Sequence, residues 1–334
     1  MATTTTTPSQ AAEATARPKA EGKKTNIGRI VAWAVMIILI LITLFPFYWM
    51  LRTALSTSKS LFSDPASLLP VDFTWGAFKR VLGLSTAAEA QAEGGSGAAV
   101  NFWLFLRNSF IFATVCTVGQ MFFSALAAYA FARLRWPGRD KVFFCALAAY
   151  AFARLRWPGR DKVFFLFLTA LMIPPIFVAL PNFILIKNLG LLNTFPGLIL
   201  PYFFMTPFAI FFLRQFFLGI SREIEEAAKI DGAGHWRIFF RIVLPMSWAP
   251  IITLFILTFI TQWNEYFWPL LVGSNDKTRV LTVAIGVFRS QTPQGSPDWA
   301  GLMAAVLVAA LPILILFFAF ARKIVNSIGF SGMK

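Results

Sequence analysis

The chain has 334 residues, of which 57% are hydrophobic and only 13% carry a charge. A soluble domain carries about 25% charged residues, so this composition excludes a soluble globular protein and predicts an all-α, polytopic membrane protein. The net charge of +15 would also fit a nucleic-acid-binding protein, and its distribution along the chain decides between the two.

Six apolar segments are long enough to cross a hydrocarbon core of about 30 Å. They cover residues 30–51, 109–132, 163–186, 197–218, 247–272 and 300–321. An even number of spans puts both termini on one side of the membrane, which we expect to be the cytoplasm. Residues 1–26 are rich in Thr, Ala and Lys, and they should form a disordered cytoplasmic tail. Residues 27–334 then form the transmembrane domain.

The charges divide unevenly between the two sides of the membrane. We count Arg214, near the inner end of the fourth span, with the cytoplasmic side, and Glu265, in the outer half of the fifth span, with the external side. The cytoplasmic side then holds 21 Lys and Arg against 8 acidic residues, and the external side holds 9 against 7. The two sides therefore carry net charges of +13 and +2. This is the positive-inside bias of an inner-membrane protein, so we expect contacts with membrane lipid and no nucleic-acid partner.

The first external loop covers residues 52–100. Its 87–99 part includes Gly94-Gly95-Ser96-Gly97, and this composition predicts a flexible segment. Arg107, at the start of the second span, is interpreted as an interfacial anchor, with contact to a substrate as the alternative. The shorter external segments cover residues 187–195 and 273–299.

A tandem duplication follows the second span. Residues 125–144 recur identically as residues 146–165, which leaves 21 surplus residues. The apolar run at 142–153 in this piece reaches only about 18 Å as a helix, too short to cross the membrane. We therefore expect residues 134–162 to form an insertion on the cytoplasmic side. It adds a contact with an ATPase subunit, or it is a passive insertion or a sequence error.

A polar stretch at residues 219–246 lies between the fourth and fifth spans. Ser221 is placed to cap a helix, and acidic residues follow in its first turns, where the helix dipole favours negative charge. Ile224, Ala227 and Ala228 share one face, and Gly232 is placed to end the helix. The stretch predicts a short helix whose small residues let another protein approach closely.

The spacing of this stretch is specific. Glu226-Ala227-Ala228, Gly232, Ile242 and Leu244-Pro245 resemble the cytoplasmic EAA loop of permease subunits of bacterial ABC importers. A lone Glu-Ala-Ala would instead fit an ordinary amphipathic loop helix. In that family the loop couples the permease to an ATPase subunit. The resemblance assigns this role to Glu225, Glu226, Ala227, Ala228, Asp231, Gly232, Ala233, Leu244 and Pro245.

Other motifs narrow the class of importer. They are Ala127–Arg133 with Gly138, Met172–Pro174, Gly190–Thr194, Trp263–Glu265 and Val325–Lys334. They resemble the second permease subunit of carbohydrate importers of the maltose and glycerol-3-phosphate class, over residues 28–334 less the duplicated piece. This resemblance implies the type I ABC importer permease fold in a bacterial inner membrane. It also implies a homologous second permease, two ATPase subunits, an external solute-binding protein and a sugar substrate.

The sequence contains no catalytic constellation. It has no G-x-x-x-x-G-K-[ST] phosphate-binding loop, no Ser/His/Asp set and no converging carboxylate pair. Cys116, Cys145 and His235 offer no metal-ligand spacing and no disulfide framework. We therefore expect a transporter subunit that is not itself an enzyme, with no catalytic residue, no metal and no cofactor of its own. ATP and Mg²⁺ would be bound by the partner ATPase subunits.

Polar groups within a span are costly and tend to face a cavity or another helix. Trp263, Asn264, Glu265 and Tyr266 combine aromatic faces with hydrogen-bonding groups in the outer half of the fifth span, which suits a sugar path. The alternative is an interfacial aromatic belt.

Three other functions stay open at this point. They are an ABC importer permease for a non-sugar solute, an ion-coupled secondary transporter and a membrane scaffold. The secondary transporter would need charged residues at mid-membrane, and the spans have almost none.

Overall fold

The computed structural model describes residues 27–97, 101–133, 174–289 and 297–329. Its contacts divide the chain into two compact units, Met1–Trp49 and Met50–Lys334. The described residues form helices and no strand, with one isolated antiparallel bridge between Ser56 and Phe73. The predicted helical class is therefore confirmed for these ranges.

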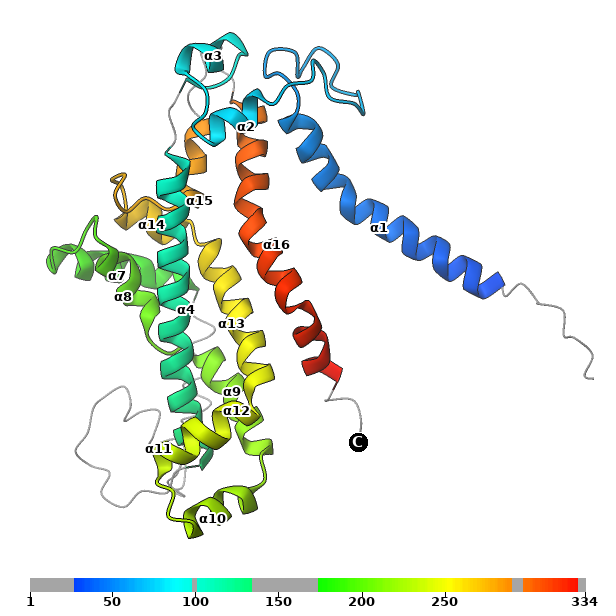
Figure 1. The fold of residues 1–334 in the computed structure, drawn as a ribbon. Coiled ribbons are helices and arrows are strands. Elements are labelled where there is room, and N and C mark those ends of the chain that lie inside the picture. Colours follow the sequence, from blue (N-terminus) through cyan, green and yellow to red (C-terminus); the bar gives the residue numbers. More distant parts are fainter. Residues whose placement is uncertain (1–26, 98–100, 134–173, 290–296, 330–334) are drawn as a thin grey trace, which may run out of the picture. The chain divides into compact units, whose positions relative to one another are not determined.

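Helix α1, Ile27–Ala54, begins in the first unit and supplies nearly all of its described residues (Figure 1). Its 28 residues reach about 42 Å at 1.5 Å per residue, enough to cross a bilayer. The side chains from Gly28 to Tyr48 are exposed. The first predicted span is thus a helix of sufficient length, and its last five residues belong to the second unit.

The second unit is built around α4, Phe102–Arg133, which is the long central helix in Figure 1. Four elements pack directly on it: α8 (Phe195–Phe203), α9 (Pro207–Gly219), α13 (Trp248–Trp263) and α15 (Leu281–Ile285). Helix α16, Trp299–Gly329, packs against α13 and against α2, Gly76–Val81. The other elements are α3 (Ala87–Ala92), α7 (Pro175–Asn188), α10 (Arg222–Ile230), α11 (His235–Ile238), η3 (Phe239–Val243), α12 (Leu244–Met246), α14 (Phe267–Val272) and η4 (Gly286–Arg289).

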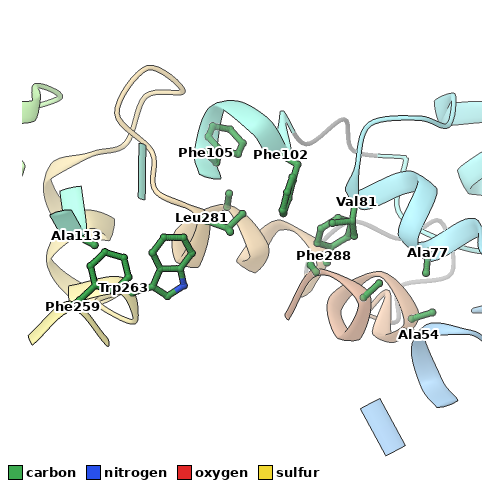
Figure 2. Packing of buried hydrophobic residues seen from close by; sticks show 14 residues of the cluster. Ala54, Ala77, Val81, Phe102, Phe105, Ala113, Phe259, Trp263, Leu281 and Phe288 are labelled. Carbon is green, nitrogen blue, oxygen red and sulfur yellow. The ribbon is translucent and has the colours of Figure 1, made fainter. Parts of the chain in front are cut away.

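Two apolar clusters lie at opposite ends of α4. The first joins α4 to α2, α15 and α16 around Phe102, Phe105 and Phe288. In Figure 2, Leu281 lies between the side chains of Phe105 and Trp263 in this cluster. The second cluster joins the other half of α4 to α9 and α11 around Leu213, Phe217 and Phe239. We call these the first and second clusters.

The first cluster is covered by residues 55–97, which a buried carboxylate holds in place. Asp298 directly precedes α16 and is fully buried. Its carboxylate accepts hydrogen bonds from the Ser58 hydroxyl at 2.9 Å, the Arg80 guanidinium at 3.2 Å and the Ser96 amide at 2.8 Å. It also accepts from the Gly301 amide at 2.8 Å, as a helix N-cap does. One side chain therefore starts α16 and anchors the covering segment.

The expectation that residues 87–99 are flexible was wrong for residues 87–92. These form α3, and Thr86 and Glu89 make a complete capping box at its start. The Thr86 hydroxyl accepts from the Glu89 amide, and the Glu89 carboxylate accepts from the Thr86 amide. The Thr-x-x-Glu spacing was the local signal for this helix. Gly95 and Ser96 are buried, so the small residues serve close packing.

The fourth predicted span is interrupted instead of continuous. Helix α8 ends at Phe203, α9 begins at Pro207, and the two are bent by 46°. Proline has no amide proton, and its ring clashes with the carbonyl four residues earlier. Side chains of α4 satisfy the opened backbone: the Gln120 amide donates to the Tyr202 carbonyl at 2.6 Å, and the Ser124 hydroxyl accepts from the Thr206 amide at 3.3 Å.

The fifth predicted span is interrupted in the same way. Helix α13 ends at Trp263, and α14 begins at Phe267. Pro269 leaves the Glu265 carbonyl without its helical donor, and the Thr282 hydroxyl donates to that oxygen at 2.8 Å. The continuous helix predicted for residues 247–272 was therefore wrong at 264–266.

Three described helices are long and apolar enough to cross a membrane, or up to five spans if each bent pair counts as one. Helix α4 begins at Phe102 instead of at residue 109, because the side-chain oxygen of Asn101 caps it by accepting from the Leu104 amide at 3.3 Å. Asn108 in the second turn is buried, and its amide donates to the carbonyls of Lys277 and Arg279. The third predicted span, residues 163–186, lies partly outside the described residues. The count of six therefore stays a prediction, as does the cytoplasmic placement of the termini.

Two further predictions fall on residues that the structure does not describe. The tail at residues 1–26 is one of them, and the duplicated insertion at 134–162 is the other.

Candidate coupling and path residues

Helix α10 confirms the predicted short helix in the 219–246 loop. It covers Arg222–Ile230, and the Ser221 hydroxyl caps it by accepting from the Glu223 amide at 3.3 Å. The Glu side chains of the first turn lie where the helix dipole favours negative charge. The helix lies at the end of α4 opposite to α2 and α3 (Figure 1).

The end of α10 explains why glycine stands at position 232. The Gly232 amide donates to the Lys229 carbonyl at 3.0 Å, and the Ala233 amide donates to the Ala228 carbonyl at 2.9 Å. This pair of bonds is a Schellman motif, which needs a left-handed residue between its donors. Gly232 has φ +79°, a conformation that glycine adopts without steric cost. The predicted stop is confirmed.

The Ala residues of the signature lie on two different sides of α10. Ala228 and Ala233 pack against the second cluster, and Glu225 is buried on the same side, three residues before Ala228. Glu226 and Ala227 are exposed. The predicted small-residue face is therefore divided: Ala228 seats the helix on its own chain, and Ala227 faces outward.

Two strongly exposed apolar side chains, which were not among the predicted coupling residues, belong to the same loop. The side chain of Ile230 is 88% exposed at the last position of α10, and that of Trp236 is 67% exposed in α11. An apolar residue two positions before a glycine stop, in an otherwise charged loop, was the available signal. We call Glu226, Ala227, Ile230 and Trp236 the α10 surface.

The end of the loop connects the second cluster to α13. Phe239–Val243 form a π-helical turn, in which the Leu244 amide donates to the Phe239 carbonyl. Pro245 cannot donate to the Arg241 carbonyl, so the wider turn avoids a regular helix at this point. After Met246 the chain bends by 79° into α13. Leu244 and Pro245, both predicted to belong to the coupling loop, lie directly before this bend.

The four predicted path residues do not share one environment. Trp263 is buried in the first cluster, where its ring stacks on Phe259 at 5.7 Å between centroids and its indole donates to the Ala309 carbonyl at 3.2 Å. The Glu265 carboxylate accepts from the Trp268 amide at 3.2 Å and so caps α14. Asn264 and Tyr266 are exposed.

Asn264 continues a stripe of exposed side chains on α13. The side chains of Leu257, Thr261 and Asn264 are exposed at intervals of four and three residues, which places them on one face. The Thr261 hydroxyl donates to the Leu257 carbonyl at 2.9 Å, and the Asn264 amide donates to the Ile260 carbonyl at 2.8 Å. Each group keeps acceptor lone pairs for a further partner.

The described residues hold no group of three or more His, Cys, Asp or Glu side chains that could bind a metal ion. Arg107 is exposed, and its guanidinium donates to the Asn108 carboxamide at 3.3 Å. Asn108 in turn holds the segment after α14, so Arg107 stands beside a fixed loop.

Comparison with known proteins identifies the family. Residues 141–329, more than half of the chain, match the family described as "Binding-protein-dependent transport system inner membrane component". The chain belongs to this family. As a member of it, the chain is an ABC importer permease, a multi-pass protein of the inner membrane.

Individual relatives agree with this assignment. The sn-glycerol-3-phosphate transport system permease protein UgpE of Pectobacterium atrosepticum is 32% identical over 301 residues, which cover 90% of this chain and 95% of the relative. The diacetylchitobiose uptake system permease protein NgcG of Streptomyces coelicolor is 30% identical, covering 90% of this chain and 85% of the relative.

A solved structure shows the same fold. It belongs to a bacterial ABC transporter involved in the import of the acidic polysaccharide alginate. The matched chain has a TM-score of 0.67 and 20% identity, and the match covers 90% of this chain and 98% of that one. The permease fold is therefore that of an ABC importer.

Proposed function

We propose that this permease imports a sugar or a sugar derivative and that its α10 surface docks on an ATPase subunit. A homologous permease would complete the path, two ATPase subunits would bind on the cytoplasmic side, and a solute-binding protein would deliver the substrate from outside. The permease relatives named for glycerol-3-phosphate and diacetylchitobiose support the substrate class. A non-sugar solute is the alternative.

The exposure of Ile230 is the observation that carries the docking proposal. An apolar side chain that is 88% exposed loses contact with water only when a partner covers it, and this loss is favourable. It stands on a helix that is fixed at both ends, by the Ser221 cap and by the Gly232 stop. A rigid helix can transmit a displacement of its partner to the second cluster, on which Ala228 packs.

ATP would then be bound and hydrolysed by the partner subunits and not by this chain. The sequence has no phosphate-binding loop, so ATP and Mg²⁺ would be held by the ATPase subunits. Closure of the ATPase pair would move α10, and the 79° bend before α13 would carry this movement to the spans. Both termini and the 219–246 loop would face the cytoplasm in this arrangement.

Ile230→Ser tests the docking surface. The reconstituted complex should lose ATPase subunits during purification and lose solute-stimulated ATP hydrolysis. Leu84→Ser is the matched control, because Leu84 is 72% exposed in the segment that covers the opposite end of α4, and it should retain both. Glu226→Lys should act like Ile230→Ser through its charge. Normal co-purification and hydrolysis in both α10 variants would refute the proposal.

We further propose that Asn264 and Tyr266 line the path and that Trp263 and Glu265 fix their positions. The α13 stripe supports this assignment, since hydroxyl and carboxamide groups can form hydrogen bonds with a sugar. Asn264→Ala should impair uptake in proteoliposomes and leave association with the ATPase subunits unchanged. Leu257→Ala, on the same face but apolar, should have a smaller effect.

Equal uptake kinetics for Asn264→Ala, Leu257→Ala and the unaltered protein would contradict the path assignment. These residues would then form an interfacial aromatic belt. The same assay with a panel of sugars, polyols and amino acids tests the substrate class. Import of a non-sugar in preference to every sugar would overturn that part of the proposal.

A further inference from the structure

An exposed apolar segment, residues 62–75, follows α1 after a short connection at residues 55–61. Within residues 62–75, five large side chains are exposed, by 55% to 71%: Phe62, Leu68, Leu69, Phe73 and Trp75. Isolated exposed apolar residues are ordinary, but several of them in one short segment mark an interaction surface. We call residues 62–75 the apolar loop. Neither the ATPase contact nor the path accounts for it.

Arg52 holds the first half of the apolar loop at the end of α1. Its side chain is buried, and its guanidinium donates to the Ser67 carbonyl and to the Asp64 carbonyl, both at 3.1 Å. The loop carbonyls thus lie within one side-chain length of residue 52. Leu68 and Leu69 follow Ser67 directly, so they are held near the same level.

Ser56 and its neighbours hold the second half. Ser56 forms an antiparallel bridge with Phe73, and the Thr74 amide donates to the Leu55 carbonyl at 2.9 Å. The Ser56 hydroxyl accepts from the Val71 amide at 3.1 Å. Phe73 is therefore paired with a residue that stands only two positions after the end of α1.

The hydrogen bonds to Arg52, Leu55 and Ser56 determine the depth of the loop relative to a membrane. The apolar run of α1 covers residues 30–51, about 33 Å of helix, which matches a hydrocarbon core of about 30 Å. Arg52 and Ser56 then stand at the boundary between hydrocarbon and headgroups. Because the loop is bonded to both, it lies at this boundary instead of projecting away from the membrane.

We propose that the apolar loop is an interfacial anchor that inserts its exposed side chains among the lipid headgroups at the level of Arg52. Phe73 and Trp75 form an edge-to-face pair with centroids 5.9 Å apart, and aromatic residues are enriched at this depth. The exposed charged groups of the loop, Asp64 and Asp72, are both acidic, so its attachment rests on apolar contact and needs no anionic lipid. The apolar loop therefore binds the bilayer itself.

Site-directed fluorescence tests the proposal in the full-length chain. Leu69→Cys is introduced with Cys116→Ala and Cys145→Ala and labelled with an environment-sensitive fluorophore. The protein is reconstituted into phosphatidylcholine vesicles that contain lipids carrying a headgroup or shallow acyl-chain quencher. Ala88→Cys is the matched control, because Ala88 is exposed on α3 and outside the apolar loop.

The label at position 69 should show a blue-shifted emission and loss of intensity with the lipid-borne quencher, whereas the label at position 88 should respond to aqueous iodide. Phe73→Ser combined with Trp75→Ser should reduce the lipid quenching at position 69. Equal iodide access at both positions would overturn the proposal. A label at position 69 that is shielded only after the solute-binding protein is added would also overturn it, in favour of a protein interface.

Discussion

The two ends of α4 are organised by different forces. At the α2–α3 end, the buried Asp298 carboxylate accepts from three separated residues of the covering segment and from Gly301 of α16. At the α10 end, the loop rests on the apolar second cluster through Ala228 and Ala233, and the α10 surface stays exposed. Directional hydrogen bonds hold the covering segment in one fixed position. The apolar contacts of Ala228 and Ala233 with the second cluster are not directional.

The largest expected effect is at the polar end. Asp298→Ala leaves the buried Arg80 guanidinium without one of its two carboxylates and removes the cap of α16. Breaking a buried ion pair costs about 3–5 kcal/mol, which thermal unfolding in detergent would measure. Asp276→Ala is the control, because Asp276 pairs with Arg279 at 2.9 Å but is 72% exposed, and such pairs contribute about 0–1 kcal/mol. Similar losses of unfolding free energy in both variants would contradict the role of Asp298 in holding the covering segment.

At the apolar end, Phe217→Ala should destabilise the second cluster. The Phe217 side chain is fully buried against α4 and α11, and truncating a buried Phe costs about 3–5 kcal/mol. Its neighbour Phe216 is 37% exposed, so Phe216→Ala should cost clearly less in the same unfolding assay. Equal losses of stability in the two variants would contradict the expected contribution of Phe217 to the second cluster.

A smaller effect is expected at the end of α10. Gly232→Ala meets no atom within 4 Å, so its cost comes from the left-handed backbone alone, about 1–2 kcal/mol. Gly234→Ala has equally open space, but Gly234 has φ −70° and should be tolerated. Proteolysis of the 219–246 loop would report this difference. Faster cleavage of the Gly234→Ala variant would contradict the Schellman explanation.

The smallest effect concerns α3 and depends on pH. Hydrogen bonds from the Thr86 amide and hydroxyl hold the pKa of the Glu89 carboxyl below its usual range. A pKa lowered by folding contributes stability above the unfolded value, and this contribution is lost as the pH falls through the folded value. The protection of the amides of residues 87–92 against exchange, taken relative to the intrinsic exchange rate at each pH, should therefore fall in acid. In Glu89→Gln that loss of protection should be absent, and its persistence would exclude the capping box as the cause.

Much of the α10 region could be predicted from the sequence because its signals are local. A Ser cap, acidic first-turn residues and a glycine stop act within one turn of the backbone, so Ser221 and Gly232 fix the helix wherever it lies. The Thr86-x-x-Glu89 box is equally local, and it outweighed the glycine-rich composition that predicted a flexible segment. Hydrophobicity likewise located α1, α4 and α16.

Tertiary contacts decided the rest. The breaks at Pro207 and Pro269 are tolerated because α4 offers Gln120 and Ser124 to one break and α15 offers Thr282 to the other. No local sequence pattern contains these partners. Only the packing shows that Ala228 faces inward and Ile230 outward, since a nine-residue helix of mixed composition leaves its buried side undefined. For the same reason Trp263 turned toward Ala309 of α16 while its neighbour Asn264 stayed exposed: composition places a residue in a helix, but the surrounding helices decide which side chains are covered.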